Sequence, residues 1–122
     1  MLLHSFRLFL VLALILTLTM AWLPHPPHTP LEQFDKLQHM VAFATLAILA
    51  TLAFPSVPPA IIGERLSFLG ALVEVVQALP AIHRDCDIKD WIADTVAIAV
   101  ALVFVAVIRK RLEAEPSLAA AE

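Results

Sequence analysis

Glycine and cysteine are both scarce in this chain, and their scarcity excludes several kinds of functional site. The sequence contains two glycines, Gly63 and Gly70, so it has no glycine-rich loop of the kind that cradles phosphate groups. Its one cysteine, Cys86, excludes an internal disulfide and a metal site built only of cysteines. No hydrolase signature is present either. The chemistry of the chain therefore has to come from its carboxylate, histidine, amide and basic side chains.

Charged residues are scarce as well. They make up 16% of the 122 residues, and hydrophobic residues make up 61%, whereas a globular domain is about one quarter charged and about half apolar. The mean hydropathy of +0.87 points to lipid as the solvent of this chain. The net charge of −3 is too small to indicate a nucleic-acid partner. We therefore expect one small membrane domain, with membrane lipid as its partner.

Apolar segments alternate with proline-containing stretches along the chain. Each segment is near the lower end of the roughly 17–25 residues that a spanning helix needs. All nine prolines fall outside the segments, and this supports the division because proline removes a backbone donor and ends helices. We predict an all-α, polytopic membrane protein with four transmembrane helices in a single domain, residues 1–112, followed by a flexible tail, residues 113–122. The predicted helices cover residues 8–23, 39–54, 61–79 and 91–108.

The first segment allows a second interpretation. Arg7, the apolar run after it and Thr19-Met20-Ala21 also fit a signal peptide that is cleaved from the mature chain. Trp22, just before Pro24, fits a membrane-interface anchor equally well. We favour a retained helix because three further helices follow and need a partner to pack against.

Lysine and arginine are distributed unequally between the two sides of the predicted bundle. One side would carry Arg7, Arg65, Arg109, Lys110 and Arg111, and the other would carry Lys36, Arg84 and Lys89. Because lysine and arginine concentrate on the cytoplasmic side, we predict that both termini are cytoplasmic and that the loops 24–38 and 80–90 face outward. Glu64 and Arg65 interrupt the start of the third segment, which is therefore the weakest of the predicted spans.

Polar residues of three predicted helices fall on the same faces as small residues. At about 100° per residue, the acidic, histidine and glutamine side chains share a face with alanine, glycine or serine, and small residues mark close helix contacts in membranes. We therefore expect these side chains to converge near the outer surface of the bundle. They are Asp35, His39, Glu74, Gln77, Asp87, Asp90 and Asp94, with Lys36 and Arg84 as the cations within reach.

Several of these acids also have a structural interpretation. Asp35, Asp87 and Asp90 stand where helices begin, and carboxylates there commonly cap free backbone amides. Glu74 lies six residues before the next proline, where no cap position explains it. Asp94 lies one turn into the fourth helix, and an ionisable group inside a membrane helix indicates a functional site. Glu74 and Asp94 are therefore the strongest functional candidates.

The order and spacing of these residues resemble a known family. The matching motifs are Asp35-Lys36-x-x-His39, Glu74-x-x-Gln77 and Arg84-x-x-Asp87-x-x-Asp90-x-x-x-Asp94-Thr95. From Asp35 to about Ile108 the chain is similar to the VanZ-like family of small bacterial membrane proteins. It departs from the family at Asp94, where asparagine is usual, and at Ala97, where glycine is usual. The resemblance implies a bacterial inner-membrane protein, and the family takes its name from a member associated with resistance to teicoplanin.

Our first functional hypothesis is that the chain binds or modifies an anionic, lipid-linked molecule of the cell envelope. The basic residues would hold a phosphate group, and a histidine or carboxylate would act as general base. A divalent cation, Mg²⁺, Mn²⁺ or Zn²⁺, would have to bridge the acids to the phosphate because like charges repel. The candidate residues are His39, Glu74 and Asp94 for catalysis, Asp35, Lys36, Gln77 and Arg84 for substrate binding, and Asp87 and Asp90 for the metal.

Two other functions fit the same residues. A non-enzymatic membrane scaffold or accessory subunit would use the acids as caps and helix contacts, and the small size of the chain favours it. An ion- or proton-coupled transporter would use buried acids as a relay. The transporter ranks last because the ionisable groups gather on one side of the predicted membrane domain.

Overall fold

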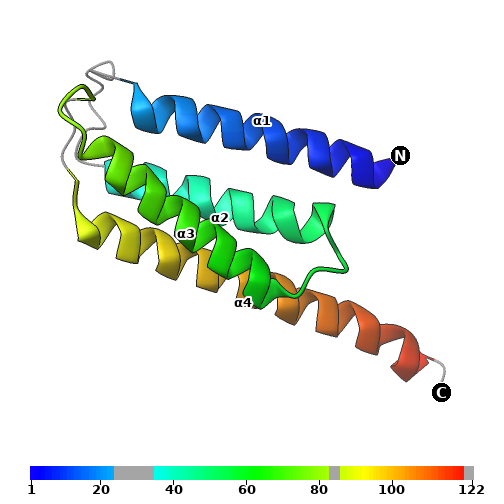
Figure 1. Ribbon diagram of the computed structural model, residues 1–122. Helices are drawn as coiled ribbons and strands as arrows, with labels where there is room; N and C mark the ends of the chain where they lie inside the picture. The colour runs from blue at the N-terminus through cyan, green and yellow to red at the C-terminus, as the bar shows by residue number, and fades with distance from the viewer. Residues whose placement is uncertain (24–34, 83–85, 120–122) are drawn as a thin grey trace.

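The computed structural model is a bundle of antiparallel α-helices (Figure 1). It describes residues 1–23, 35–82 and 86–119, and for residue 35 and residues 115–119 it describes the backbone alone. In chain order the helices are α1 (Leu2–Trp22), α2 (Asp35–Ala53), α3 (Pro59–Gln77) and α4 (Ile88–Ala119). The described ranges contain no strand. The predicted all-α fold with four helices is confirmed for this part of the chain.

The helices extend beyond the apolar segments from which they were predicted. α1 begins at Leu2 and α2 at Asp35, several residues before the apolar runs. α4 continues to Ala119, into the segment predicted as a flexible tail. Backbone hydrogen bonding does not depend on polarity, and leucine, lysine, glutamate and alanine all favour helix. α3 begins directly at Pro59 because the fixed φ of proline suits the first helical position, where no donor is required.

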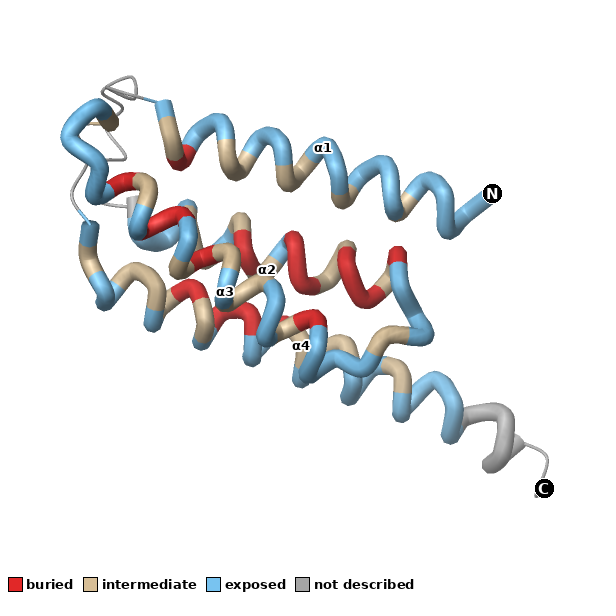
Figure 2. Tube along the Cα trace, in the orientation of Figure 1, coloured by how far each residue is buried: buried red, intermediate tan, exposed pale blue. Residues whose placement is uncertain are grey.

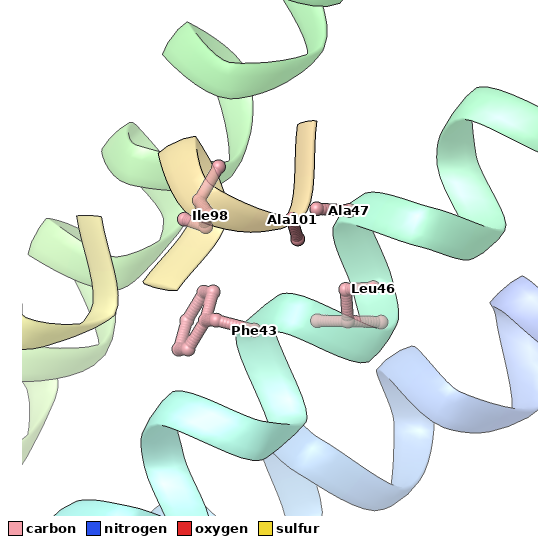
Figure 3. Packing of buried hydrophobic residues seen from close by; sticks show 5 residues of the cluster. All are labelled: Phe43, Leu46, Ala47, Ile98 and Ala101. Atoms are coloured by element: carbon pink, nitrogen blue, oxygen red, sulfur yellow. The ribbon is translucent and has the colours of Figure 1, made fainter. Parts of the chain in front are cut away.

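The core of the bundle is built around α2. Phe43, Leu46 and Ala47 of α2 are buried against Ile98 and Ala101 of α4 (Figure 3). Partly buried leucine and alanine side chains of α1 and α3 complete this cluster from the other sides. α2 and α3 each contact all of the other helices, whereas α1 and α4 do not contact each other in the described part of the chain. The contact between α2 and α4 is the most extensive one described, and these two helices carry most of the candidate site.

The outer surface of the bundle is strongly apolar. Most residues of α1 are exposed, from one end of the helix to the other, and so are the outward faces of the other helices (Figure 2). Three helical segments are long enough and apolar enough to cross a membrane: Leu2–Trp22, Lys36–Ala53 and Ile88–Ala114. α3 is not among them, and it carries three charged residues, Glu64, Arg65 and Glu74. Exposed apolar surface of this extent is typical of a protein surrounded by lipid.

Both glycines lie where α3 approaches α4 closely. A Cβ atom on Gly63 would stand 3.0 Å from Cδ1 of Leu102, and one on Gly70 would stand 3.4 Å from Cδ1 of Trp91. Small residues let membrane helices approach each other in this way. The predicted packing role of Gly70 is confirmed, and this close contact holds the end of α3 beside the start of α4.

Candidate functional site

Polar side chains gather at one end of the bundle, where α2 and α4 begin and α3 ends (Figure 1). The antiparallel order of the helices brings these segments together although they are far apart in the sequence. We call the described side chains at this end the polar cluster. Its members are Lys36 and His39 of α2, Glu74 and Gln77 of α3, and Asp87, Asp90 and Asp94 at the start of α4.

An ion pair closes the outer edge of the polar cluster. Nζ of Lys36 lies 3.1 Å from Oδ1 of Asp90, which links α2 to α4. The side chain of Lys36 is 47% exposed, so water competes for this contact and the pair contributes little to stability. Lys36 is therefore free to exchange Asp90 for another anion at small cost.

A second acid–base pair lies deeper between the same helices. Nδ1 of His39 is 3.8 Å from Oδ2 of Asp94, a separation too long for a direct hydrogen bond but short enough for a strong charge interaction. Asp94 is 1% exposed, and its Oδ1 atom has no hydrogen-bond partner within the described ranges. The expected inward orientation of Asp94 is confirmed, and its environment is that of a buried acid.

Glu74 contacts the segment that joins α3 to α4. Its Oε2 atom accepts a hydrogen bond from the backbone N–H of Asp87 at 3.1 Å. The thiol of Cys86 also donates a hydrogen bond to Glu74. With 5% of its surface exposed, Glu74 holds the start of α4 in place from the neighbouring helix. The sequence singled out Glu74 as functional but gave no sign of this backbone partner.

Cys86 is exposed, and its thiol is kept in the protonated form. Desolvation raises the pKa of the thiol above its ordinary value, and the nearby carboxylates of Glu74, Asp87 and Asp90 raise it further. Because the thiolate is the reactive form, Cys86 has the environment of an unreactive thiol. This agrees with the sequence analysis, which gave Cys86 no role in the candidate site.

Asp87 caps α4. Its Oδ1 atom accepts a hydrogen bond from the backbone N–H of Lys89 at 2.9 Å, and its carbonyl accepts one from the N–H of Asp90 at 2.8 Å. The capping interpretation of Asp87 is confirmed. No three histidine, cysteine or acidic residues come together as a metal site in the described part of the chain. The assignment of Asp87 and Asp90 to a metal stays a prediction.

Gln77 joins α3 to α1. Its Nε2 atom donates a hydrogen bond to the backbone carbonyl of Ala21 at 2.9 Å, and both residues are buried. The expectation that Gln77 faces the interior is confirmed. Its described partner is a backbone group of the protein itself, so the proposed role in substrate binding has no support from this contact.

Ser67 and Thr95 form a polar contact that was not predicted. Their hydroxyl oxygens are 2.8 Å apart across α3 and α4, and the indole N–H of Trp91 donates to the carbonyl of Ser67 at 3.0 Å. Ser67 was expected on the packing face of its helix, but nothing in the sequence specified Thr95 as its partner. These bonds fix α3 against α4 next to the polar cluster, since Trp91 and Thr95 directly follow two of its members in the sequence.

Arginines occupy the opposite end of the bundle and bind the last turn of α2. Arg109 donates from a terminal guanidinium nitrogen to the carbonyl of Thr51 at 2.8 Å, and Nε of Arg7 donates to the carbonyl of Ala53 at 3.3 Å. Arg7 also lies over the ring of Phe54, 5.2 Å from its centroid. Thr51 needs an external donor because Pro55, four residues later, has no N–H. That spacing is the sequence signal for this contact.

An open apolar groove of about 360 Å³ runs along the last turns of α1. It is lined by Ile15, Leu18, Thr19, Trp22 and Leu23. The indole nitrogen of Trp22 is buried and has no hydrogen-bond partner in the described part of the structure. Ala21, between these lining residues in the sequence, accepts the hydrogen bond of Gln77 through its carbonyl. The last turns of α1 thus carry both an apolar groove and a contact with the polar cluster.

Two of the predicted site residues lie outside this description. Arg84 is not among the described residues, and of Asp35 only the backbone is described. His39, Glu74 and Asp94, predicted for catalysis, meet Lys36 and Asp90 at one end of the bundle. No family model, no curated protein and no solved structure matches this chain. Its similarity to the VanZ-like family therefore stays a resemblance of motifs.

Proposed function

We propose that the chain is a four-span protein of the bacterial inner membrane, similar to VanZ-like proteins, with both termini in the cytoplasm. The basic end of the bundle carries Arg7 and Arg109, and the polar cluster lies at the other end. This polarity supports the orientation because lysine and arginine concentrate on the cytoplasmic side. α3 serves as the fourth span because it packs against α2 and α4, which are long and apolar enough to cross the membrane.

The polar cluster binds or modifies an anionic lipid-linked molecule of the cell envelope. The observation that carries this proposal is the burial of two acids, Glu74 and Asp94, which are 5% and 1% exposed at one end of a bundle with an apolar surface. Acids in such surroundings are costly and mark binding or proton-transfer sites. The groove along the last turns of α1 would supply an apolar surface for a lipid chain, on the helix whose Ala21 carbonyl binds Gln77 of the polar cluster.

The described contacts suggest how such a ligand would be held. Lys36 would leave Asp90 to bind a phosphate oxygen, since its exposed side chain gives up little in doing so. His39, held near Asp94, is the best-placed general base. The remaining acids would repel a phosphate, so a divalent cation would bridge Asp87 or Asp90 to the ligand.

Ligand binding to the purified protein in lipid nanodiscs tests this function. The probe is a polyprenyl phosphate, measured by native mass spectrometry with and without Mg²⁺ against a neutral polyprenol. We expect Lys36→Gln to weaken binding by about tenfold, the effect of losing one charge-assisted contact of ~1.4 kcal/mol. Glu74→Gln is also expected to weaken binding. Glu64→Gln, on the same helix at the opposite end, is the matched control and is expected to bind like the unmodified protein.

The outcome that would overturn this function is equal binding of the polyprenyl phosphate and the polyprenol by all of these proteins. A specific observation favours the scaffold alternative in that case. Glu74 and Gln77 bind backbone groups of the protein itself, and Lys36 pairs with Asp90. If the chain is a scaffold, substitutions at these positions should lower the melting temperature. The unmodified protein should then show no specific binding of the phosphate.

A further inference from the structure

Asp94 is the most deeply buried acid in the described part of the chain. It is 1% exposed, and one carboxyl oxygen, Oδ1, has no hydrogen-bond partner there. An ionised carboxyl group in such a position costs several kcal/mol unless a positive charge or a proton offsets it. A proton is the smallest ligand that can offset this charge, and a nearby base can supply it.

His39 supplies the matching base. Its Nδ1 atom faces Oδ2 of Asp94 at 3.8 Å, and its side chain is 14% exposed. Imidazole is the side chain that changes charge most readily near neutral pH. The pair has no net charge when His39 and Asp94 carry one titratable proton between them, either as imidazolium and carboxylate or as neutral imidazole and carboxylic acid. Removing that proton leaves a neutral imidazole beside a buried carboxylate. Adding a second one leaves an imidazolium beside a carboxylic acid, with a net positive charge.

The other charged groups around the pair are already engaged with different partners. From α2, Lys36 binds Asp90. From α3, Glu74 accepts the N–H of Asp87 and interacts electrostatically with His39. From α4, Asp87 caps its own helix. α1 contributes to this end the carbonyl of Ala21, which is uncharged. The described surroundings hold more carboxylates than cations, so they oppose removal of the proton from the pair.

We propose that His39 and Asp94 form a proton-binding site that holds one proton between α2 and α4. The proton is carried either by the imidazole of His39 or by the carboxyl group of Asp94, and the total charge of the pair is zero in both cases. Loss of that proton would leave Asp94 as an uncompensated buried charge, which would loosen the contact between α2 and α4 at the polar end. This site goes beyond the proposed function, because it is occupied whether or not an envelope molecule binds.

Spectroscopy of the protein without any added ligand tests this site. The chain has five histidines, and replacing the other four by glutamine leaves His39 as the single imidazole signal. Nitrogen NMR of that protein in nanodiscs reports whether His39 is charged, and infrared difference spectra against Asp94→Asn report whether Asp94 carries a proton. At neutral pH we expect one proton in total, on one residue or the other. Finding none, or finding both residues protonated, would overturn the proposal.

A double-substitution cycle gives a second, independent test. His39→Gln and Asp94→Asn each leave a former partner unpaired, so the double variant is expected to lose less melting temperature than the sum of the single losses. Strictly additive losses would contradict the pairing. Lys36→Gln with Asp90→Asn is the control pair on the same helices. Because no lipid-linked ligand is present in either test, a failure here is distinct from a failure of the proposed function.

Discussion

The side-chain amide of Gln77 donates a hydrogen bond of 2.9 Å to the backbone carbonyl of Ala21, and this joins α3 to α1 in a buried position. Along its middle α1 meets the bundle through partly buried leucine and alanine side chains, and at its other end Arg7 donates to the carbonyl of Ala53. Most of the surface of α1 is exposed. Apolar contacts between helices are not specific when lipid offers the same surface. The bond from Gln77 therefore gives α1 a fixed register at the polar end.

Replacing Gln77 by leucine is expected to loosen α1. The substitution keeps a similar volume but leaves the carbonyl of Ala21 without its donor, at a cost of about 1 kcal/mol for a hydrogen bond within a membrane bundle. The measurement is the unfolding free energy in mixed micelles. Gln38→Leu is the matched control, because Gln38 is exposed on α2, and it is expected to have no effect. Equal stability of both variants would show that the bond does not hold α1.

The end of α2 offers a sharper test, because one substitution is expected to rescue another. Arg109→Leu removes the donor to the carbonyl of Thr51, and an unsatisfied buried carbonyl costs about 1–3 kcal/mol. Pro55→Ala restores a backbone N–H four residues after Thr51, so the double variant is expected to regain much of the lost unfolding free energy. Lys110→Leu, an exposed neighbour, is the control. Absence of rescue would mean that Arg109 stabilises the bundle by another route.

The reactivity of Cys86 reports on the charge of Glu74. Because desolvation and the nearby acids raise the pKa of this thiol, it holds less thiolate than a free cysteine at neutral pH and is expected to react more slowly with a maleimide. Its rate should rise as the pH is raised through the elevated pKa. Glu74→Gln removes the negative charge that helps to raise the pKa of the thiol, so it should lower this pKa and speed the reaction.

The control for this measurement is Glu64→Gln, which removes a charge from the opposite end of α3 and should leave the rate unchanged. Stopped-flow alkylation over a pH series gives the titration curve of the single thiol directly. An unmodified protein that reacts as fast as a short cysteine peptide would contradict the contact between Cys86 and Glu74.

The sequence predicted the faces of the helices better than the partners of the side chains. Helical spacing and small residues placed Glu74, Gln77 and Asp94 on packing faces, and all three are buried. Their contacts could not be derived in the same way, because they depend on the path of loops and on backbone groups of other helices. The bond from Glu74 to the N–H of Asp87 requires the start of α4 to lie beside the end of α3, and no side-chain pattern encodes that approach.

Some of the missing information was nevertheless present in the sequence. Arg7 and Arg109 were interpreted only as signals of orientation, although the proline four residues after Thr51 indicates an orphaned carbonyl that needs a donor. The helix ends were also predicted too short at several places, because polarity marks the part of a helix inside lipid and not the whole helix. α4 illustrates this, since its basic residues Arg109–Arg111 continue the same helix to Ala119.

The single cysteine also allows the predicted orientation to be measured. If the polar end faces outward, a membrane-impermeant maleimide should label Cys86 in intact cells, slowly at neutral pH and faster in mildly alkaline medium because its pKa is raised. The matched protein is Cys86→Ser with Glu113→Cys, which moves the thiol to the far end of α4, where residue 113 is exposed. That protein should react only after the membrane is permeabilised. The reverse labelling pattern would show that the bundle has the opposite orientation in the membrane. The polar cluster would then face cytoplasmic molecules in place of an envelope lipid.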